Sequence, residues 1–137
     1  MADKFVMCEV VTPERVLYSG NVKMVVAPGI EGEVGVLPLH APLVAVLGVG
    51  ELRLKLDENK YEYVAVHKGY IQVLEDKVII LANFAEFASE IDVERAKKAK
   101  EGAAKEIIEA QKKGEDYYKA QIDLEKAENR LRISKRI

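Results

Sequence analysis

Short runs of apolar residues, separated by turn-forming residues, occupy the chain from residue 4 to about residue 87. Between residues 51 and 56, leucines alternate with charged residues, which is the period-two pattern of a strand with one buried face. The pattern predicts strands at residues 5–11, 22–27, 43–47, 51–56, 61–67, 70–74 and 78–82. Polar clusters suited to hairpin turns separate several of them, and no helix-length pattern interrupts the series. We therefore predict an antiparallel β-sandwich or barrel over residues 1–88.

Beyond residue 89 the apolar pattern changes to the period of an α-helix. Apolar residues recur at spacings of three or four in two series: Ala96, Ala99, Ala103, Ile107 and Ala110, then Tyr117, Ala120, Leu124, Ala127 and Leu131. Asp92 is suited to cap the first helix, Gly114 to end it in a left-handed conformation, and Asp116 to cap the second. The sequence therefore predicts an antiparallel two-helix hairpin over residues 89–137, which makes the whole fold α+β.

The seam of this predicted hairpin is thin, because an alanine buries far less apolar area than a leucine or isoleucine. Ordering the backbone costs about 1 to 2 kcal/mol per residue, so such a hairpin is expected to be marginal by itself. Two interpretations stay open at this point. The helices form a permanently packed domain, or they leave one surface and bind another.

Composition argues against a nucleic-acid-binding, secreted or membrane-spanning protein. The chain has 137 residues, a net charge of -2 with both signs interspersed, and no tryptophan, which argues against nucleic-acid binding. A single cysteine, Cys8, allows no intrachain disulfide, and the N-terminus lacks the pattern of a signal peptide, so a cytoplasmic location is expected. No apolar run reaches the roughly 18 to 20 residues that span a bilayer, so we expect no direct membrane insertion.

No catalytic or metal-binding constellation is predicted. The glycines Gly29, Gly32 and Gly35 are not spaced as in a phosphate-binding loop, and no Gly-Lys-Ser/Thr follows them. His40 and His67 lie far apart without other ligands at metal-binding spacing. The serines have no triad context. We therefore expect a protein that is not an enzyme and that requires no cofactor.

The glycine- and proline-rich run at residues 27–44 carries a specific motif. It resembles E-G-x-x-G-x-x-P-G-H-A-P-L, a signature of the epsilon subunit of bacterial F-type ATP synthases, at Glu31, Gly32, Gly35, Pro38, His40, Ala41, Pro42 and Leu43. The resemblance extends over essentially the whole chain. Leu39 stands where the family usually has glycine, and leucine disfavours the positive φ that glycine accepts at little cost.

This resemblance implies a non-catalytic rotor-stalk subunit that couples the gamma shaft to the membrane ring (the c-ring) during proton- or sodium-driven ATP synthesis. The protein would be peripheral, on the cytoplasmic face of the cell membrane. Glu31, Glu33 and His40 are then candidates for the ring contact, since we expect Glu33 and His40 at loop tips where polar groups are easily exposed. The alternative is that these residues form plain surface.

In the same family the hairpin extends into the catalytic head and restrains ATP hydrolysis. The resemblance therefore implies contacts with the catalytic alpha and beta subunits through a basic segment that comprises Arg130, Arg132, Lys135 and Arg136. A local explanation is also open, because cations at a helix C-terminus interact favourably with the helix dipole.

Residues 91–96 resemble a second family motif, I/L-D-x-x-R-A, with which some epsilon subunits bind ATP. The candidates for such a site are Glu86, Asp92, Arg95, Ala96, Lys126 and Arg130. Lys126 and Gly102 stand where the family has arginines, so two contacts would be weakened or absent. The alternative function is thus an ATP-sensing module in which nucleotide holds the hairpin against the β-domain. Asp92 as a plain helix cap is the competing structural interpretation.

Overall fold

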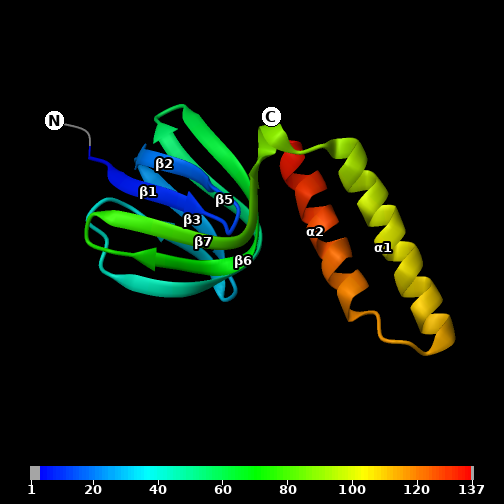
Figure 1. The fold of residues 1–137 in the computed structure, drawn as a ribbon. Helices are drawn as coiled ribbons and strands as arrows, with labels where there is room; N and C mark the ends of the chain where they lie inside the picture. The colour runs from blue at the N-terminus through cyan, green and yellow to red at the C-terminus, as the bar shows by residue number, and fades with distance from the viewer. Residues whose placement is uncertain (1–3, 137) are drawn as a thin grey trace. The chain divides into compact units, whose positions relative to one another are not determined.

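The computed structural model describes residues 4–136 and divides into two compact units, of which the first ends at Phe87 and the second begins at Ala88. Strands make up the first unit and helices the second (Figure 1). The predicted order of a strand domain followed by a two-helix hairpin is confirmed.

The first unit is a seven-stranded sheet that curls around its core (Figure 1). Its strands are β1 (Val6–Val11), β2 (Val16–Val22), β3 (Met24–Gly29), β4 (Gly32–Val36), β5 (Leu43–Asp57), β6 (Lys60–Val73) and β7 (Lys77–Phe87). They lie in the order β2-β1-β7-β6-β5-β3-β4. Neighbouring strands are antiparallel except β1 and β7, which pair in parallel although they come from opposite ends of the unit.

The strand predictions were incomplete in two ways. The sequence pattern missed β2 and β4, and it divided each of β5 and β6 into two strands. In β6 the apparent break is a local irregularity, where Lys68 and Gly69 have φ values of 62° and 144°. A Cβ on Gly69 would overlap the carbonyl of Leu81, so only glycine fits this point of close strand approach.

Branched aliphatic side chains fill the core of the first unit. The largest fully buried ones of this unit are Leu47, Leu52, Leu54, Ile71, Ile80, Val10, Val22, Val25, Val36, Val64 and Val66. Leu52 and Leu54 are among the positions whose alternation predicted a half-buried strand. β-Branched residues suit this pleated, tightly packed environment, which explains why valine dominates the core.

The second unit contains a short 3₁₀ helix, η1 (Ala88–Glu90), and two α-helices, α1 (Val93–Lys113) and α2 (Tyr118–Ser134). Asp92 caps α1, because its side chain accepts a hydrogen bond from the Arg95 backbone N–H at 3.1 Å. Gly114 ends α1 with φ 68° and ψ 24°, as predicted. Asp116 accepts a hydrogen bond from the Tyr118 N–H at 2.9 Å, just before α2.

Alanines form the seam between α1 and α2, as the sequence predicted. The buried alanines of the two helices are Ala96, Ala103, Ala120 and Ala127. Larger members of the predicted series, such as Ile107 and Leu124, are only half-buried. In the part of the chain that the structure describes, no helix is long and apolar enough to cross a membrane.

Candidate functional site

The motif run of residues 27–44 forms one edge of the sheet. It covers the end of β3, the β3–β4 turn, the edge strand β4 and the loop that leads into β5. Glu31 lies in the β3–β4 turn and is exposed. Gly32 follows with φ 129°, a conformation that residues with a side chain rarely adopt, so this glycine makes the tight turn possible.

Glu33 lies within β4 and not at a loop tip, which corrects the sequence prediction. One of its carboxylate oxygens, Oε2, is 2.8 Å from a guanidinium nitrogen of Arg53 in β5. A second nitrogen of Arg53 lies 4.0 Å from Glu51. Glu33 nevertheless remains 67% exposed in its side chain, so the pair presents a carboxylate in a defined orientation at the surface.

Sequence reasoning did not identify Arg53 as a site residue. Its place among the polar positions of the alternating run 51–56 showed that it faces water. The partnership with Glu33 depends on the pairing of β3 with both β4 and β5, where Val26 lies opposite Arg53 and Pro28 opposite Glu33. That register is a long-range property, which local patterns do not contain.

The loop after β4 holds Leu39 and His40. Leu39 has φ 65°, so this position takes the left-handed conformation even though it carries leucine. His40 is half-buried, and its Nδ1 lies 2.7 Å from the carbonyl oxygen of Ala41. A carbonyl can only accept, so this contact requires a proton on Nδ1 and leaves Nε2 for another partner.

An exposed apolar surface adjoins this edge. Across three neighbouring strands Val46 lies opposite Tyr70 and Tyr70 opposite Leu81, and these residues are 43%, 56% and 48% exposed. Next to them a pocket of about 440 Å³ is lined by Gly29, Ile30, Glu31, Gly32, Val34, Leu43, Val44, Ala45, Val46 and Tyr70. Contiguous exposed apolar surface is common at sites that contact another molecule, so these residues are candidates for such a site.

An uninterrupted apolar run in the sequence indicates this surface, although the strand prediction alone did not reveal it. Residues 43–47 are apolar without interruption, so a strand there has apolar side chains on both faces. Leu47 is buried in the core, whereas Val44 is 66% exposed. The outward face therefore has no covering element among the described residues of this unit.

The candidates for nucleotide binding come from both units. Glu86 is half-buried in β7, opposite Ala65 of β6. Asp92, Arg95 and Ala96 belong to the start of α1, where Asp92 acts as the cap and Ala96 is buried in the seam. The other two, Lys126 and Arg130, are half-buried in α2.

Within the helical unit, antiparallel packing brings the start of α1 and the end of α2 to the same end of the hairpin (Figure 1). The basic segment lies there as well. Arg130 and Arg132 belong to α2, Lys135 follows directly, and the Arg136 N–H donates to the Ile133 carbonyl at 3.0 Å. Arg132 donates to the side-chain oxygen of Asn129 at 2.5 Å. Asn129 is only 2% exposed, and this buried polar residue was not anticipated.

Metal-binding clusters and the single thiol can be assessed among the described residues. Within residues 4–136 no three His, Cys, Asp or Glu side chains are placed to hold a metal ion. Burial raises the pKa of the Cys8 thiol to about 12, and the charge of Glu9 adds to this effect. The thiol is therefore protonated at neutral pH and is a poor nucleophile.

Comparison with known proteins gives matches over both units. A family model described as ATP synthase, Delta/Epsilon chain, beta-sandwich domain matches residues 6–88. A second model, described as ATP synthase, Delta/Epsilon chain, long alpha-helix domain, matches residues 89–135. The ATP synthase epsilon chain of Halalkalibacterium halodurans is 46% identical over 93% of this chain and 95% of its own length. The ATP synthase epsilon chain of Syntrophomonas wolfei is 43% identical over 99% of this chain and 98% of its own length.

Among solved structures, a chain of the Euglena gracilis mitochondrial ATP synthase, determined as an OSCP/F1/c-ring assembly, has a TM-score of 0.75 and 25% identity. The match covers 91% of this chain and 78% of that one. A central stalk and c-ring structure from Tetrahymena thermophila has a TM-score of 0.54 at 15% identity, which supports the similarity of fold alone.

Proposed function

The chain belongs to the delta/epsilon chain family of ATP synthases, and from this premise we propose that it joins the gamma shaft to the membrane ring as a subunit of the central stalk. The subunit itself is non-catalytic. The observation that carries the proposal is the match of both family domains, in order, over residues 6–88 and 89–135. The chain would be peripheral, on the cytoplasmic face of the membrane, and would contribute to ATP synthesis through coupling.

The ring contact is assigned to the motif edge of the sheet. Glu31 is exposed in the β3–β4 turn, Arg53 orients the carboxylate of Glu33, and the tautomer of His40 leaves Nε2 for a partner. The neighbouring apolar surface adds area that a second protein can bury. These features support a docking edge that combines directional polar groups with apolar contact.

Ion pumping by the reconstituted enzyme tests this coupling role. ATP-driven pumping is expected to fail when the chain is omitted and to return when it is added back. The double variant Glu31→Lys, Glu33→Lys should bind the ring more weakly and restore less pumping, because it reverses both charges and places a lysine beside Arg53. Glu14→Lys, in the exposed β1–β2 turn, is the matched control and should restore pumping fully. Equal pumping by both variants would remove the assignment.

The hairpin is assigned a regulatory role, in which it extends toward the catalytic alpha and beta subunits and restrains ATP hydrolysis. Two features support this role. Four of the six buried residues of α1 and α2 are alanines, which contribute little apolar burial, and the basic segment lies at the end of α2. Neutralising the segment should relieve the inhibition, because charge attraction to acidic partner surfaces is lost. The four changes are Arg130→Gln, Arg132→Gln, Lys135→Gln and Arg136→Gln.

A matched control is available in the same unit. Lys112 and Lys113 lie in the last turn of α1 and are exposed, so neutralising them changes charge at the opposite end of the hairpin. ATP hydrolysis should rise with the four-residue variant and stay unchanged with the control. If inhibition persisted in the four-residue variant, the basic segment would have no part in it.

The second candidate function is ATP sensing by the hairpin. The observation that favours it is the antiparallel packing, which brings the end of α1 that carries Asp92 and Arg95 near the end of α2 that carries Arg130. ATP would then act as a regulatory ligand and not as a substrate. Calorimetric titration of ATP tests this directly, and Lys126→Arg should tighten binding because it restores a planar guanidinium. If neither the parent chain nor the Lys126→Arg variant gave a heat of binding, this candidate function would be eliminated.

A further inference from the structure

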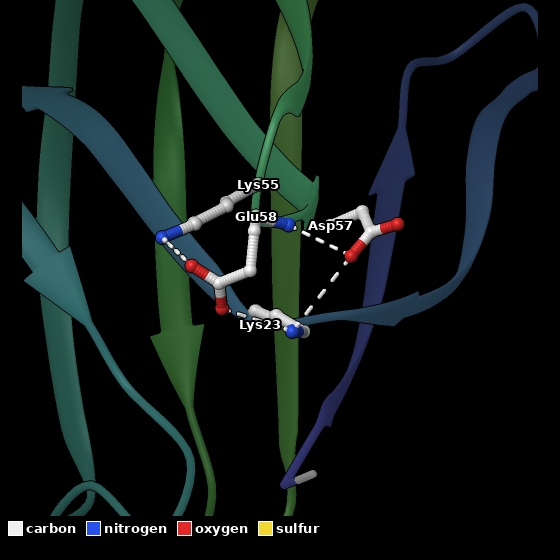
Figure 2. A network of polar contacts seen from close by, with 4 residues as sticks. All are labelled: Lys23, Lys55, Asp57 and Glu58. Atoms are coloured by element: carbon white, nitrogen blue, oxygen red, sulfur yellow. Dashed lines mark hydrogen bonds and ion pairs between the residues drawn. The ribbon is translucent and has the colours of Figure 1, made fainter.

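A cluster of charges lies on the β-unit around the β5–β6 turn, outside the motif edge (Figure 2). Lys23, at the junction of β2 and β3, places its Nζ 3.0 Å from one carboxylate oxygen of Glu58. Lys55, near the end of β5, places its Nζ 3.6 Å from the other oxygen. The two ammonium groups therefore approach the carboxylate of Glu58 from two sides, and the Lys23 Nζ also lies 3.9 Å from a carboxylate oxygen of Asp57 (Figure 2).

The cations are confined, whereas the carboxylate is open to solvent. The side chains of Lys23 and Lys55 are 12% and 23% exposed, but that of Glu58 is 71% exposed. Lys23 lies over the ring of Phe5 at 5.9 Å and Lys55 over that of Tyr61 at 6.0 Å. These aromatic contacts are attractive interactions of the ammonium groups that do not involve Glu58.

The backbone adds to this preorganisation. The Lys23 N–H donates to the Lys55 carbonyl at 2.7 Å, so the two lysines project from neighbouring segments whose separation is set by the sheet. Glu58 instead belongs to the two-residue connection between β5 and β6. Rotation of its side chain into solvent would take Glu58 away from both ammonium groups without any change in the strands, and Lys23 would keep its ion pair with Asp57 at 3.9 Å.

A pocket of about 370 Å³ lies at the same place and is lined by Lys4, Lys23, Met24, Leu37, Pro38, Lys55 and Glu58. Among the described residues that line this pocket, three are lysines and one, Glu58, is acidic, and a second carboxylate, that of Asp57, lies 3.9 Å from the Lys23 Nζ. The two ammonium groups also keep the pKa of Glu58 below its ordinary value, first through the hydrogen bond from Lys23. The carboxylate of Glu58 is therefore held in its charged form by the two cations.

We propose that Lys23 and Lys55, with Lys4 at the pocket wall, bind a small tetrahedral oxyanion of the phosphate class, and that Glu58 occupies this site when no ligand is bound. Phosphate carries more charge than a carboxylate and offers more acceptor oxygens, so it can accept from both lysines at once. Its source is inorganic phosphate or the phosphoryl group of a nucleotide, and the two have the same recognition chemistry here.

Backbone amide shifts in NMR spectra test the site on the full chain. Inorganic phosphate, ATP and acetate are titrated separately at constant ionic strength, with the amides of Lys23, Lys55 and Glu58 as reporters. Phosphate should give saturable shifts. Glu58→Gln should tighten its binding about fivefold, because removal of a like charge about 4 Å from the ligand is worth a factor of this size in a solvated site.

Three further variants make the outcome decisive. Lys23→Met and Lys55→Met should each abolish the saturable shifts, whereas Lys60→Met removes a charge from the same turn region without touching the pocket and should bind phosphate as the parent does. Saturable shifts with phosphate but not with ATP would identify free phosphate as the ligand. Saturable shifts with ATP but not with phosphate would identify a nucleotide. The proposal is overturned if neither the parent nor Glu58→Gln saturates, or if Lys60→Met weakens binding as much as Lys23→Met.

Discussion

Two glycines of the helical unit should respond to the same substitution with opposite signs. Gly102 lies inside α1 and is exposed, and a Cβ built on it would meet nothing within 4 Å. Replacing it with alanine changes only the backbone preference, so Gly102→Ala should stabilise the helical unit by about 1 kcal/mol. Gly114 has φ 68° at the end of α1, and Gly114→Ala should destabilise it by about 1 to 2 kcal/mol because a left-handed conformation is strained for a residue with a Cβ.

Hydrogen exchange of the amides within α1 measures this difference. The two variants should differ by about 2 to 3 kcal/mol in the free energy of opening, which corresponds to roughly 30- to 150-fold in protection at constant pH. Amides of β5 and β6 serve as the internal reference, since both substitutions lie outside the β-unit. The reasoning is refuted if both variants shift protection in the same direction, or if Gly102→Ala lowers it.

Substitutions at three other positions test single features of the structure. Leu39→Gly should raise the free energy of unfolding by about 0.5 to 1 kcal/mol, because relief of the strain at φ 65° outweighs the entropy that glycine adds to the unfolded chain. Urea titration measures the change, and a loss of stability would disprove the strain. Asp92→Ala removes the cap of α1 and should lower the free energy of unfolding by about 1 kcal/mol, whereas Asp92→Asn should retain most of the stabilisation by the cap. Equal losses of stability in the two variants would argue against capping. Because the pKa of Cys8 is raised to about 12 from 9.0, its neutral thiol stabilises the folded state fully below pH 9, and this contribution is lost as pH rises toward 12. Cys8→Ala should flatten that part of the pH–stability curve, and an unchanged slope would exclude the thiol as its cause.

The features that the sequence predicted correctly are local. Asp92 and its hydrogen bond to the Arg95 N–H lie three residues apart, and Gly114 acts through its own backbone angles. The alternation around Leu52 and Leu54 likewise reflects one strand and its two faces. Such signals depend on a few neighbouring residues, so a pattern contains them completely.

The features that the sequence did not predict depend on pairing between distant segments. β4 contains Gly32 and Gly35, which disfavour a strand, and it forms one because β3 supplies its hydrogen-bonding partners. The parallel pairing of β1 with β7 brings together residues about seventy positions apart, such as Met7 and Lys77. Glu33 became an oriented carboxylate only through the register that brings it to Arg53.

The candidate site shows the same division. The motif run gave Glu31 and His40 as candidates and Leu39 as the position where leucine replaces glycine. The structure places this run at an edge of the sheet and gives Leu39 a φ of 65°. It did not reveal the apolar surface around Val46 and Tyr70, because exposure depends on which elements cover a strand face. Residue types therefore pointed to the segment for which docking is proposed, and the fold was needed to show which surface lies beside it.

In the proposed division of roles, the β-unit couples the shaft to the ring and the hairpin restrains ATP hydrolysis. The most direct test compares ATP hydrolysis by the catalytic head without this subunit, with the full chain, and with a chain that ends at Ser89. The account predicts a low rate with the full chain only, and a rate with the shortened chain equal to that of the head alone. Equal rates in all three preparations would contradict the regulatory role of the hairpin.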